Sequence, residues 1–270
     1  CTHQQPESLR LATFNIRYDN SGDGPNSWPH RKDSICAFIH RVDPDIIDMQ
    51  EVLHHQLEVL KTDLPEYTVV GVGREDGKTA GEYAPIFFKQ AKYTLLDQNT
   101  FWLCEKPDSV GMVGWDAALT RIATWAKLQD KKTGQILMVV NTHFDHIGTE
   151  ARRNSALLII EKIKEIVGTS PAILTGDFNV SEDWDAYKTI TNNEFILKDA
   201  HKVAGKRTGV DFTYHDFGKI PAEKCEKIDF IFVTPQIRVI SSYIPFSQLN
   251  DTLFLSDHNP EIVELEIEKS

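Results

Sequence analysis

The sequence lacks any apolar run that approaches the roughly 20 residues needed to cross a bilayer, which excludes an integral membrane protein. It also lacks a Ser/Gly linker, a low-complexity tract and an internal repeat. Strand-like and helix-like runs instead follow one another to the end of the chain. We therefore expect one domain over residues 9–270, preceded by a polar leash at residues 1–8.

Cysteine is scarce, and its spacing forms no metal or disulfide pattern. The four cysteines are Cys1, Cys36, Cys104 and Cys225, with no CxxC pair among them. Cys36 and Cys104 lie in or after apolar stretches, so we expect both to be free and partly buried thiols.

Cys1 has two interpretations, which the chain itself does not separate. A bacterial lipoprotein matures with a lipid-modified cysteine as its first residue, and a polar segment follows Cys1 here. The alternative is an arbitrary boundary of the sequence. On the first interpretation we expect a protein of the bacterial envelope or periplasm, tethered through lipid on Cys1, and on the second a soluble protein. On either interpretation we expect a monomer.

Positive charge is in deficit, with 29 Lys and Arg against 40 Asp and Glu and a formal net charge of -11. This balance argues against a general nucleic-acid binder, because contacts to phosphates drive that affinity. It does not exclude a local basic site, and a cluster of metal-binding carboxylates would also make the total negative.

Two groups of strands, each accompanied by helices, are predicted from hydrophobic periodicity. Strands are expected at residues 9–16, 45–49, 67–72, 86–88, 93–102, 121–128, 136–141, 172–174, 228–233, 239–244 and 262–267. Helices are expected at residues 28–41 and 54–63, and a third between a Thr149 cap and Gly168. This order predicts an α/β domain in which two sheets pack together with helices outside.

Polar clusters follow the ends of several of these strands. They are Asn15, Glu51, residues 141–146 and residues 176–179. Asp229 lies inside a strand-like run, and residues 256–258 precede the last strand. Ligand sites in layered α/β folds commonly form at strand ends. Each cluster alone is weak evidence, because Asn and Asp are also common turn residues.

Asp229 is harder to explain as a turn residue, because it stands in the apolar run KIDFIF. A buried carboxylate without a partner is costly. A histidine from a neighbouring strand end would be a suitable partner, and the carboxylate would then fix the tautomer of the ring.

Taken together, the motifs TFNIR, QE, NTHFDH, GDFN, KIDFIF and SDH resemble the endonuclease/exonuclease/phosphatase superfamily. They run in this order from position 13 to 258 and cover nearly the whole chain. The superfamily includes abasic-site endonucleases, DNase I-like nucleases, poly(A) deadenylases, inositol polyphosphate 5-phosphatases and bacterial sphingomyelinases. The resemblance implies a four-layer α/β sandwich of two mixed sheets with helices outside, and a site at one end of the sheets.

The resemblance also implies roles for individual residues. It implies metal ligands at Glu51, Asn15 and Asp257, and catalytic positions at His258, Asp229, Asp177, Asn179 and His143. One departure is visible, since abasic-site endonucleases carry an acidic residue where this chain has Arg17. Their specificity therefore does not transfer directly.

These residue types suit metal-assisted hydrolysis of a phosphate ester. Mg²⁺ or Mn²⁺, as one ion or two, would be held by oxygen ligands and would neutralise the charge of the phosphate. His258 or Asp177 would act as base towards water, while a protonated His143 would stabilise developing charge. Which group is the base and which protonates the leaving oxygen stays open, because closely coupled groups share protons.

Three further residues are candidates for binding substrate. Arg121 follows a glycine-rich loop, and arginine suits phosphate. Tyr83 precedes an apolar run, and its alternative is an edge aromatic. Arg152 lies in the first turn of a helix, where a cation is slightly unfavourable, and its alternative is a solvated surface residue.

Two classes of function remain at this point, a metal-dependent phosphoesterase and a non-catalytic binding module on the same fold. The complete set of acidic and histidine residues favours the enzyme. Its substrate stays open among small phosphodiesters, single-stranded nucleic acid, and phosphorylated lipid or sugar.

Overall fold

The strands form two mixed sheets in a computed structural model that describes residues 7–192 and 197–268. The seven-stranded sheet has the order β10-β12-β13-β1-β2-β4-β3, and the six-stranded sheet has the order β5-β6-β7-β8-β11-β9. The first sheet comprises β1 (Glu7–Asn15), β2 (Ile46–Gln50), β3 (Tyr67–Val70), β4 (Ile86–Lys89), β10 (Lys206–Gly209), β12 (Ile237–Ile244) and β13 (Glu261–Ile267). The second comprises β5 (Tyr93–Trp102), β6 (Ile122–Asp130), β7 (Ile136–His143), β8 (Ala172–Asp177), β9 (Lys198–Asp199) and β11 (Asp229–Val233).

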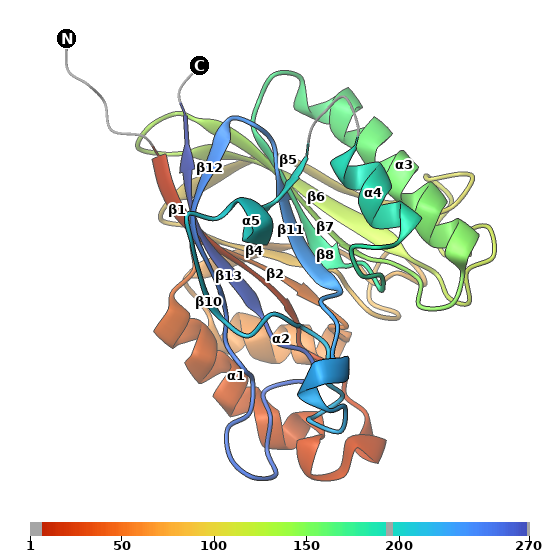
Figure 1. The fold of residues 1–270 in the computed structure, drawn as a ribbon. Coiled ribbons are helices and arrows are strands. Elements are labelled where there is room, and N and C mark those ends of the chain that lie inside the picture. Colours follow the sequence, from red (N-terminus) through yellow and green to blue (C-terminus); the bar gives the residue numbers. More distant parts are fainter. Residues whose placement is uncertain (1–6, 193–196, 269–270) are drawn as a thin grey trace.

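Helices cover the outer face of each sheet (Figure 1). They are α1 (Trp28–Val42) and α2 (His54–Asp63) on the seven-stranded sheet, and α3 (Thr149–Val167) and α4 (Asp185–Thr191) on the six-stranded sheet. The short helix α5 (Ala200–Val203) instead contacts β11 and β12, one strand from each sheet, and its Ala200 packs into the apolar cluster between the sheets. Short 3-10 helices lie at Ser21–Asn26 and Ala222–Lys224. In Figure 1, α1 and α2 lie below the strands while α3 and α4 lie at the upper right. The predicted four-layer α/β sandwich is confirmed.

Alternation along β1 explains how the layers are held together. Leu9 and Leu11 belong to the apolar cluster between the two sheets, whereas Ala12 and Phe14 belong to the cluster under α1 and α2. A strand buried on both faces needs apolar residues at both sets of alternating positions. A third cluster packs α3 and α4 against the outer face of β7, β8 and β11.

Most predicted elements are present, with shifted ends. Strand β1 begins at Glu7, so two residues assigned to the leash belong to the sheet. Thr149 does not cap α3, because it is the first helical residue and Gly148 is the cap; Gly168 ends the helix with a φ of 58°. Glycine adopts this left-handed conformation without steric cost.

Two predictions concern how the chain relates to a membrane. Within residues 7–192 and 197–268, no helix is long and apolar enough to cross a membrane. Cys1 lies outside the described residues, so lipid attachment and an envelope location stay predictions, as does the monomeric state.

The strand directions bring the predicted clusters to one edge. β1 runs parallel to β2, and β7 runs parallel to β8, so Asn15 and His143 end their strands beside Gln50 and Asp177. β11 is antiparallel to β8 and starts there, with Asp229 paired to Asp177. Side chains far apart in the sequence therefore meet where both sheets end.

Candidate active site

A cavity of about 390 Å³ opens at this edge of the sheets. Its lining residues are Arg17, Tyr18, Glu51, Glu82, Leu119, Arg121, His143, His146, Asp177, Asn179, Tyr214, Ile228, Asp257 and His258. Six of the eight predicted catalytic and metal-binding residues line it, and the other two, Asn15 and Asp229, are buried and hydrogen-bonded to lining residues.

Asn15 links carboxylates that come from the two different sheets. Its Nδ2 donates to Glu51 Oε1 at 3.0 Å and to Asp177 Oδ2 at 2.9 Å. Its Oδ1 accepts the backbone N–H of Arg17 at 3.0 Å. The amide therefore positions Glu51 and Asp177 as a donor to both, and its role as a metal ligand stays a prediction.

The predicted pair between Asp229 and a histidine is present. His258 Nδ1 lies 2.8 Å from Asp229 Oδ2, and both residues are buried. His258 Nε2 lies 3.7 Å from Asp177 Oδ2. A carboxylate on one ring nitrogen fixes the ring, so the other nitrogen is directed at the carboxylate cluster.

Glu51, Asp177 and His258 form the group best placed to hold a cation. One ligand atom from each lies within 4.8 Å of the others. This set differs from the predicted one, in which Asn15 and Asp257 accompanied Glu51. Two carboxylate oxygens with an imidazole nitrogen suit Mn²⁺, and the carboxylates suit Mg²⁺, so the donors fit either ion.

The electrostatics of the cluster also fit a cation. Burial raises the pKa of Asp177 to about 7, and repulsion from Asp229 adds to the rise. Burial likewise raises the pKa of Asp257 to about 6, with a contribution from Glu51. Carboxylates crowded away from water favour a proton or a metal ion, and a divalent cation would replace the proton.

The two histidines differ in their environments. Burial alone would lower the pKa of His258, but the hydrogen-bonded carboxylate of Asp229 holds it well above the ordinary value. Burial, together with the charge of Arg121, holds the pKa of His143 well below its ordinary value. The role of a protonated His143 in stabilising developing charge stays a prediction, and its Nε2 lies 3.5 Å from Asp177 Oδ2.

Arg121 enters the cavity from the start of β6 and is held by the loop after β7. Its Nε lies 3.4 Å from Asp145 Oδ1, and its Nη2 lies 3.0 Å from His146 Nδ1. Its buried Nη1 has no hydrogen-bond partner among the described residues. A guanidinium with a free N–H next to carboxylates and histidines is suited to a phosphate oxygen.

Asp145 is the support of this loop. Its carboxylate accepts four backbone N–H groups, those of Ala118, Leu119, Ile147 and Gly148. Although burial opposes it, these hydrogen bonds hold the pKa of Asp145 well below its usual range. Asp145 therefore fixes Arg121 and the loop.

Three cavity residues adopt left-handed backbone conformations. Arg17, Glu51 and Asn179 have φ values of 61°, 59° and 50°. Such conformations are uncommon outside glycine and often occur at functional sites. They turn the chain sharply after β1, β2 and β8, which directs these side chains into the cavity.

Two predicted substrate contacts lie outside the cavity. The hydroxyl of Tyr83 donates to Lys78 O at 2.8 Å and lies 3.0 Å from His54 Nδ1. Arg152 donates from Nη1 to Asp145 O at 3.1 Å and lines a different cavity. The geometry places neither residue among those around Glu51, so their roles as phosphate contacts stay predictions.

The sequence analysis did not identify two further residues of the cavity as functional. Glu82 lies 3.8 Å from His143 Nδ1, and burial with repulsion from Glu51 raises its pKa to about 7. Arg17 pairs with Asp23 at 2.9 Å and lies 3.7 Å from Asp257 Oδ2. In the sequence, the position of Arg17 two residues after Asn15 is the signal that points to it.

Two packed sheets with an acid, histidine and arginine cavity at their common edge define a hydrolase of phosphoric esters. The chain belongs to the endonuclease/exonuclease/phosphatase family, whose model matches residues 12–258. The predicted family is confirmed, and with it the interpretation of the chain as an enzyme.

Solved structures and curated relatives agree with this assignment. An endonuclease/exonuclease/phosphatase from Bacteroides vulgatus is 63% identical with a TM-score of 0.95, covering 97% of this chain and 100% of that one. A mannosyl-6-phosphatase from Bacteroides thetaiotaomicron is 36% identical with a TM-score of 0.89, covering 95% and 99%. Nocturnin from Drosophila melanogaster is 25% identical over 89% of this chain, which spans 42% of that protein.

Proposed function

We propose that the chain is a divalent-metal-dependent phosphoesterase that releases phosphate from a small polar ester, with sugar phosphates as its substrate class. One observation carries the proposal. The Glu51, Asp177 and His258 cluster shares a cavity with Arg121, whose buried Nη1 has no hydrogen-bond partner among the described residues.

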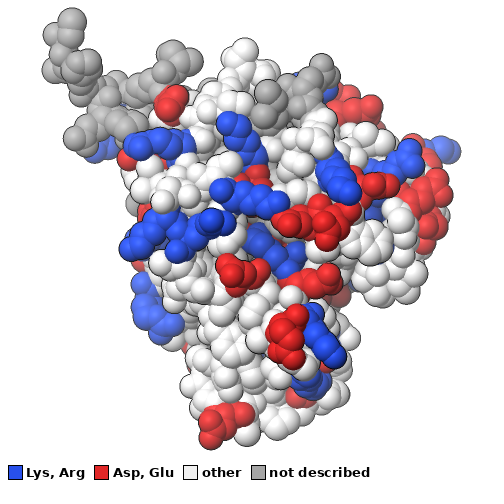
Figure 2. Space-filling model, viewed as in Figure 1, with Lys and Arg blue, Asp and Glu red and all other residues white. Residues whose placement is uncertain are grey.

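The size and charge of the surroundings favour a small substrate. The cavity volume of about 390 Å³ lies towards the lower end of ligand sites, which hold roughly 300–1,000 Å³. On the face shown in Figure 2, Lys and Arg are interspersed with Asp and Glu and form no single basic surface. A long nucleic acid would need such a surface for its phosphates.

The similarity to a mannosyl-6-phosphatase supports the choice of a sugar phosphate. That protein is 36% identical over 95% of this chain, whereas nocturnin is 25% identical over 89%. A sugar phosphatase and nocturnin both occur among the relatives, because one fold can carry different activities. The substrate class therefore needs the experiment described below.

The geometry supports a division of labour in hydrolysis. Glu51 with Asp177 would hold Mg²⁺ or Mn²⁺, which when bound neutralises phosphate charge and polarises phosphorus. His258, oriented by Asp229 at 2.8 Å, is the base towards the attacking water in its neutral form, which a cation held by Glu51 and Asp177 would favour against the raised pKa of the ring. Arg121 binds a phosphate oxygen through Nη1, and the bond from Asn179 Nδ2 to Phe144 O at 2.9 Å fixes that amide at the cavity wall.

A substrate panel tests the proposal. Phosphate release from mannose 6-phosphate, cleavage of bis(p-nitrophenyl) phosphate and shortening of an oligoadenylate would be measured with Mg²⁺, with Mn²⁺ and with EDTA. We expect the highest kcat/KM for the sugar phosphate and none of the activities in EDTA. A higher kcat/KM for the oligoadenylate than for mannose 6-phosphate would contradict the proposed sugar phosphatase activity and indicate a nuclease.

A further inference from the structure

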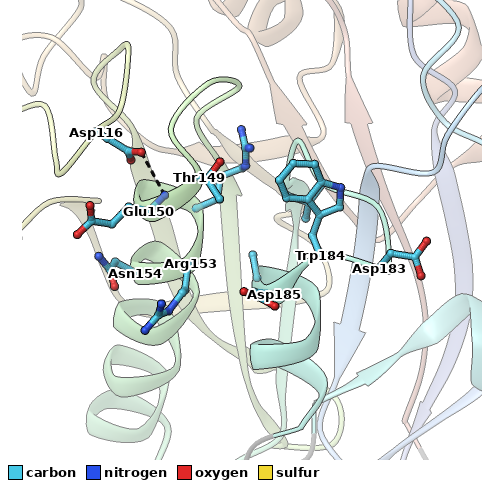
Figure 3. Close-up of a pocket in the computed structure, with 11 residues that line it drawn as sticks. Asp116, Thr149, Glu150, Arg153, Asn154, Asp183, Trp184 and Asp185 are labelled. Carbon is cyan, nitrogen blue, oxygen red and sulfur yellow. Dashed lines mark hydrogen bonds between the residues drawn. The ribbon is translucent and has the colours of Figure 1, made fainter.

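A second and larger cavity, of about 790 Å³, lies between the first turns of α3 and the loop before α4 (Figure 3). Its lining residues are Asp116, Thr149, Glu150, Arg152, Arg153, Asn154, Val180, Asp183, Trp184, Asp185 and Ala186. Figure 3 shows Arg153 and Asn154 on the α3 side and Trp184, Asp183 and Asp185 on the other.

This cavity adjoins the active site through two short segments. Asn179 lines the active-site cavity and the next residue, Val180, lines the second one. Likewise His146 lines the first and Thr149 lines the second. Side chains also link the two cavities, because Arg152 of the second cavity donates to Asp145 O at 3.1 Å and Asp145 Oδ1 lies 3.4 Å from Nε of Arg121 in the first.

Trp184 is the main aromatic surface of the second cavity. It is 42% exposed, although tryptophan is usually well buried. The guanidinium of Arg152 lies 5.0 Å from the centre of its ring, and Arg152 itself is only 4% exposed. A buried cation thus supports one side of the indole, and the exposed part of the ring is presented to the cavity.

Hydrogen-bonding groups surround this ring. Asp183, Asp185 and Glu150 are exposed carboxylates, and Asn154 adds a half-buried amide. Arg152 is further notable because its buried Nε has no hydrogen-bond partner among the described residues.

An anion is a poor match for this cavity. The first free N–H groups of α3 are already used, because Asp116 accepts from Glu150 N at 3.2 Å and from Ala151 N at 2.7 Å. Four carboxylates line the cavity against two arginines, Arg152 and Arg153, so the balance of charge also repels an anion. A neutral ligand rich in hydroxyl groups fits both the ring and the carboxylates.

We propose that the second cavity is a carbohydrate-binding subsite in which a sugar ring stacks on Trp184. The C–H face of a pyranose carries slight positive charge and packs on the negative face of an indole. The sugar hydroxyls donate to the carboxylates and to Asn154. The inference rests on the proposed sugar phosphatase activity and makes its substrate a phosphorylated oligosaccharide, whose phosphorylated unit occupies the active site.

The test compares one sugar unit with several. Rates are measured on mannose 6-phosphate and on mannotriose phosphorylated at one 6-hydroxyl, for wild type, Trp184→Ala and Trp184→Phe. Trp184→Ala should raise KM for the phosphorylated trisaccharide about tenfold with little change in kcat, and leave mannose 6-phosphate turnover unchanged. Trp184→Phe should keep most of the affinity, because it keeps an aromatic face. Tyr243→Ala, which removes a 44% exposed aromatic from β12 in the other sheet, is the matched control and should change neither KM.

A binding measurement separates the subsite from the proposed activity. Unphosphorylated mannotriose should quench tryptophan fluorescence in wild type and not in Trp184→Ala, whether or not any phosphate ester is cleaved. Quenching without hydrolysis would keep the subsite and reject the phosphatase. Equal KM values for Trp184→Ala and wild type on the trisaccharide, or no quenching at millimolar mannotriose, would overturn the subsite.

Discussion

His258 is buried among carboxylates, and the contact through its Nδ1 determines which ring nitrogen faces the cavity. Asp229 provides that contact at 2.8 Å from a strand whose other residues are apolar. The requirement that a buried carboxylate find a partner predicted a histidine beside Asp229, and the resemblance to the family identified that histidine as His258.

Replacing the orienting carboxylate should therefore impair the reaction more than the fold. We expect Asp229→Asn to lower kcat by about 100-fold or more, the contribution of a well-placed general base. Steady-state kinetics on the best substrate of the panel would measure this, with circular dichroism as a check of folding. A variant with wild-type kcat would show that His258 needs no orienting partner.

Asp48 is a second buried carboxyl, and it lies between the two sheets away from the cavity. Its Oδ2 accepts from Thr175 Oγ1 at 2.6 Å, and burial raises its pKa to about 8. Folding therefore favours the protonated form, and this contribution to stability is lost as the pH rises from about 4 towards 8.

Asp48→Asn should reduce the pH dependence of the free energy of unfolding and leave the rate of hydrolysis unchanged. Between pH 5 and pH 8 we expect wild type to lose at least about 1 kcal/mol more stability than the variant, roughly 2 °C or more in Tm. Thermal melts at the two pH values would measure this. Identical pH dependence in both proteins would mean that Asp48 is ionised in the folded chain.

Glu82 and Arg17 show where residue-scale prediction from the sequence ends. Glu82 lies in an irregular segment between β3 and β4, outside every predicted strand. Only the folded chain brings it to 3.8 Å from His143. Trp184 is a similar case, because nothing in its local sequence distinguishes an exposed tryptophan from a buried one.

At the scale of elements, the site depends on the parallel pair β7 and β8. Both strands end at the cavity, with His143 and Asp177 as neighbours across the pair. Hydrophobic periodicity predicted the strands, but strand order and direction come from pairing that no local pattern encodes. The short strands β9 and β10 were missed because two to four polar residues carry no periodic signal.

At Gly176, the backbones of β7 and β8 approach each other so closely that a side chain would not fit. A Cβ at this position would lie 2.2 Å from Thr142 O. We expect Gly176→Ala to destabilise the fold by about 2 kcal/mol or more and to reduce activity, because it pushes Asp177 away from His143. Denaturant unfolding and kinetics on one preparation would measure both effects.

Gly134→Asn is the matched control for this substitution. Gly134 has a φ of 74° in the turn between β6 and β7, and a Cβ there meets nothing within 4 Å. Asparagine tolerates this conformation, so the loss should be below about 1 kcal/mol. Equal losses for both variants would show that close packing against β7 is not what requires Gly176.

At the scale of the whole molecule, the carboxylates at the shared edge of the sheets oppose folding until a cation binds. Burial and mutual repulsion raise the pKa of Asp177 and of Asp257 above their ordinary values. A cation that binds only the folded chain stabilises it by mass action.

Mg²⁺ or Mn²⁺ at 100 times its Kd should therefore add about 2.7 kcal/mol to the free energy of unfolding. Thermal melts of the metal-stripped protein across a metal titration would show a rising Tm. The rise should be much smaller in Glu51→Gln, and the same rise in both proteins would place the cation elsewhere.

The most direct test of the account is the rate of phosphate ester hydrolysis by metal-stripped protein as Mg²⁺ or Mn²⁺ is added back. Wild type should be inactive in excess EDTA and recover activity to a saturating level. Glu51→Gln should stay folded and inactive at every metal concentration, because it lacks a carboxylate of the Glu51, Asp177 and His258 cluster. Wild-type hydrolysis that persists undiminished in excess EDTA would contradict the metal-assisted mechanism.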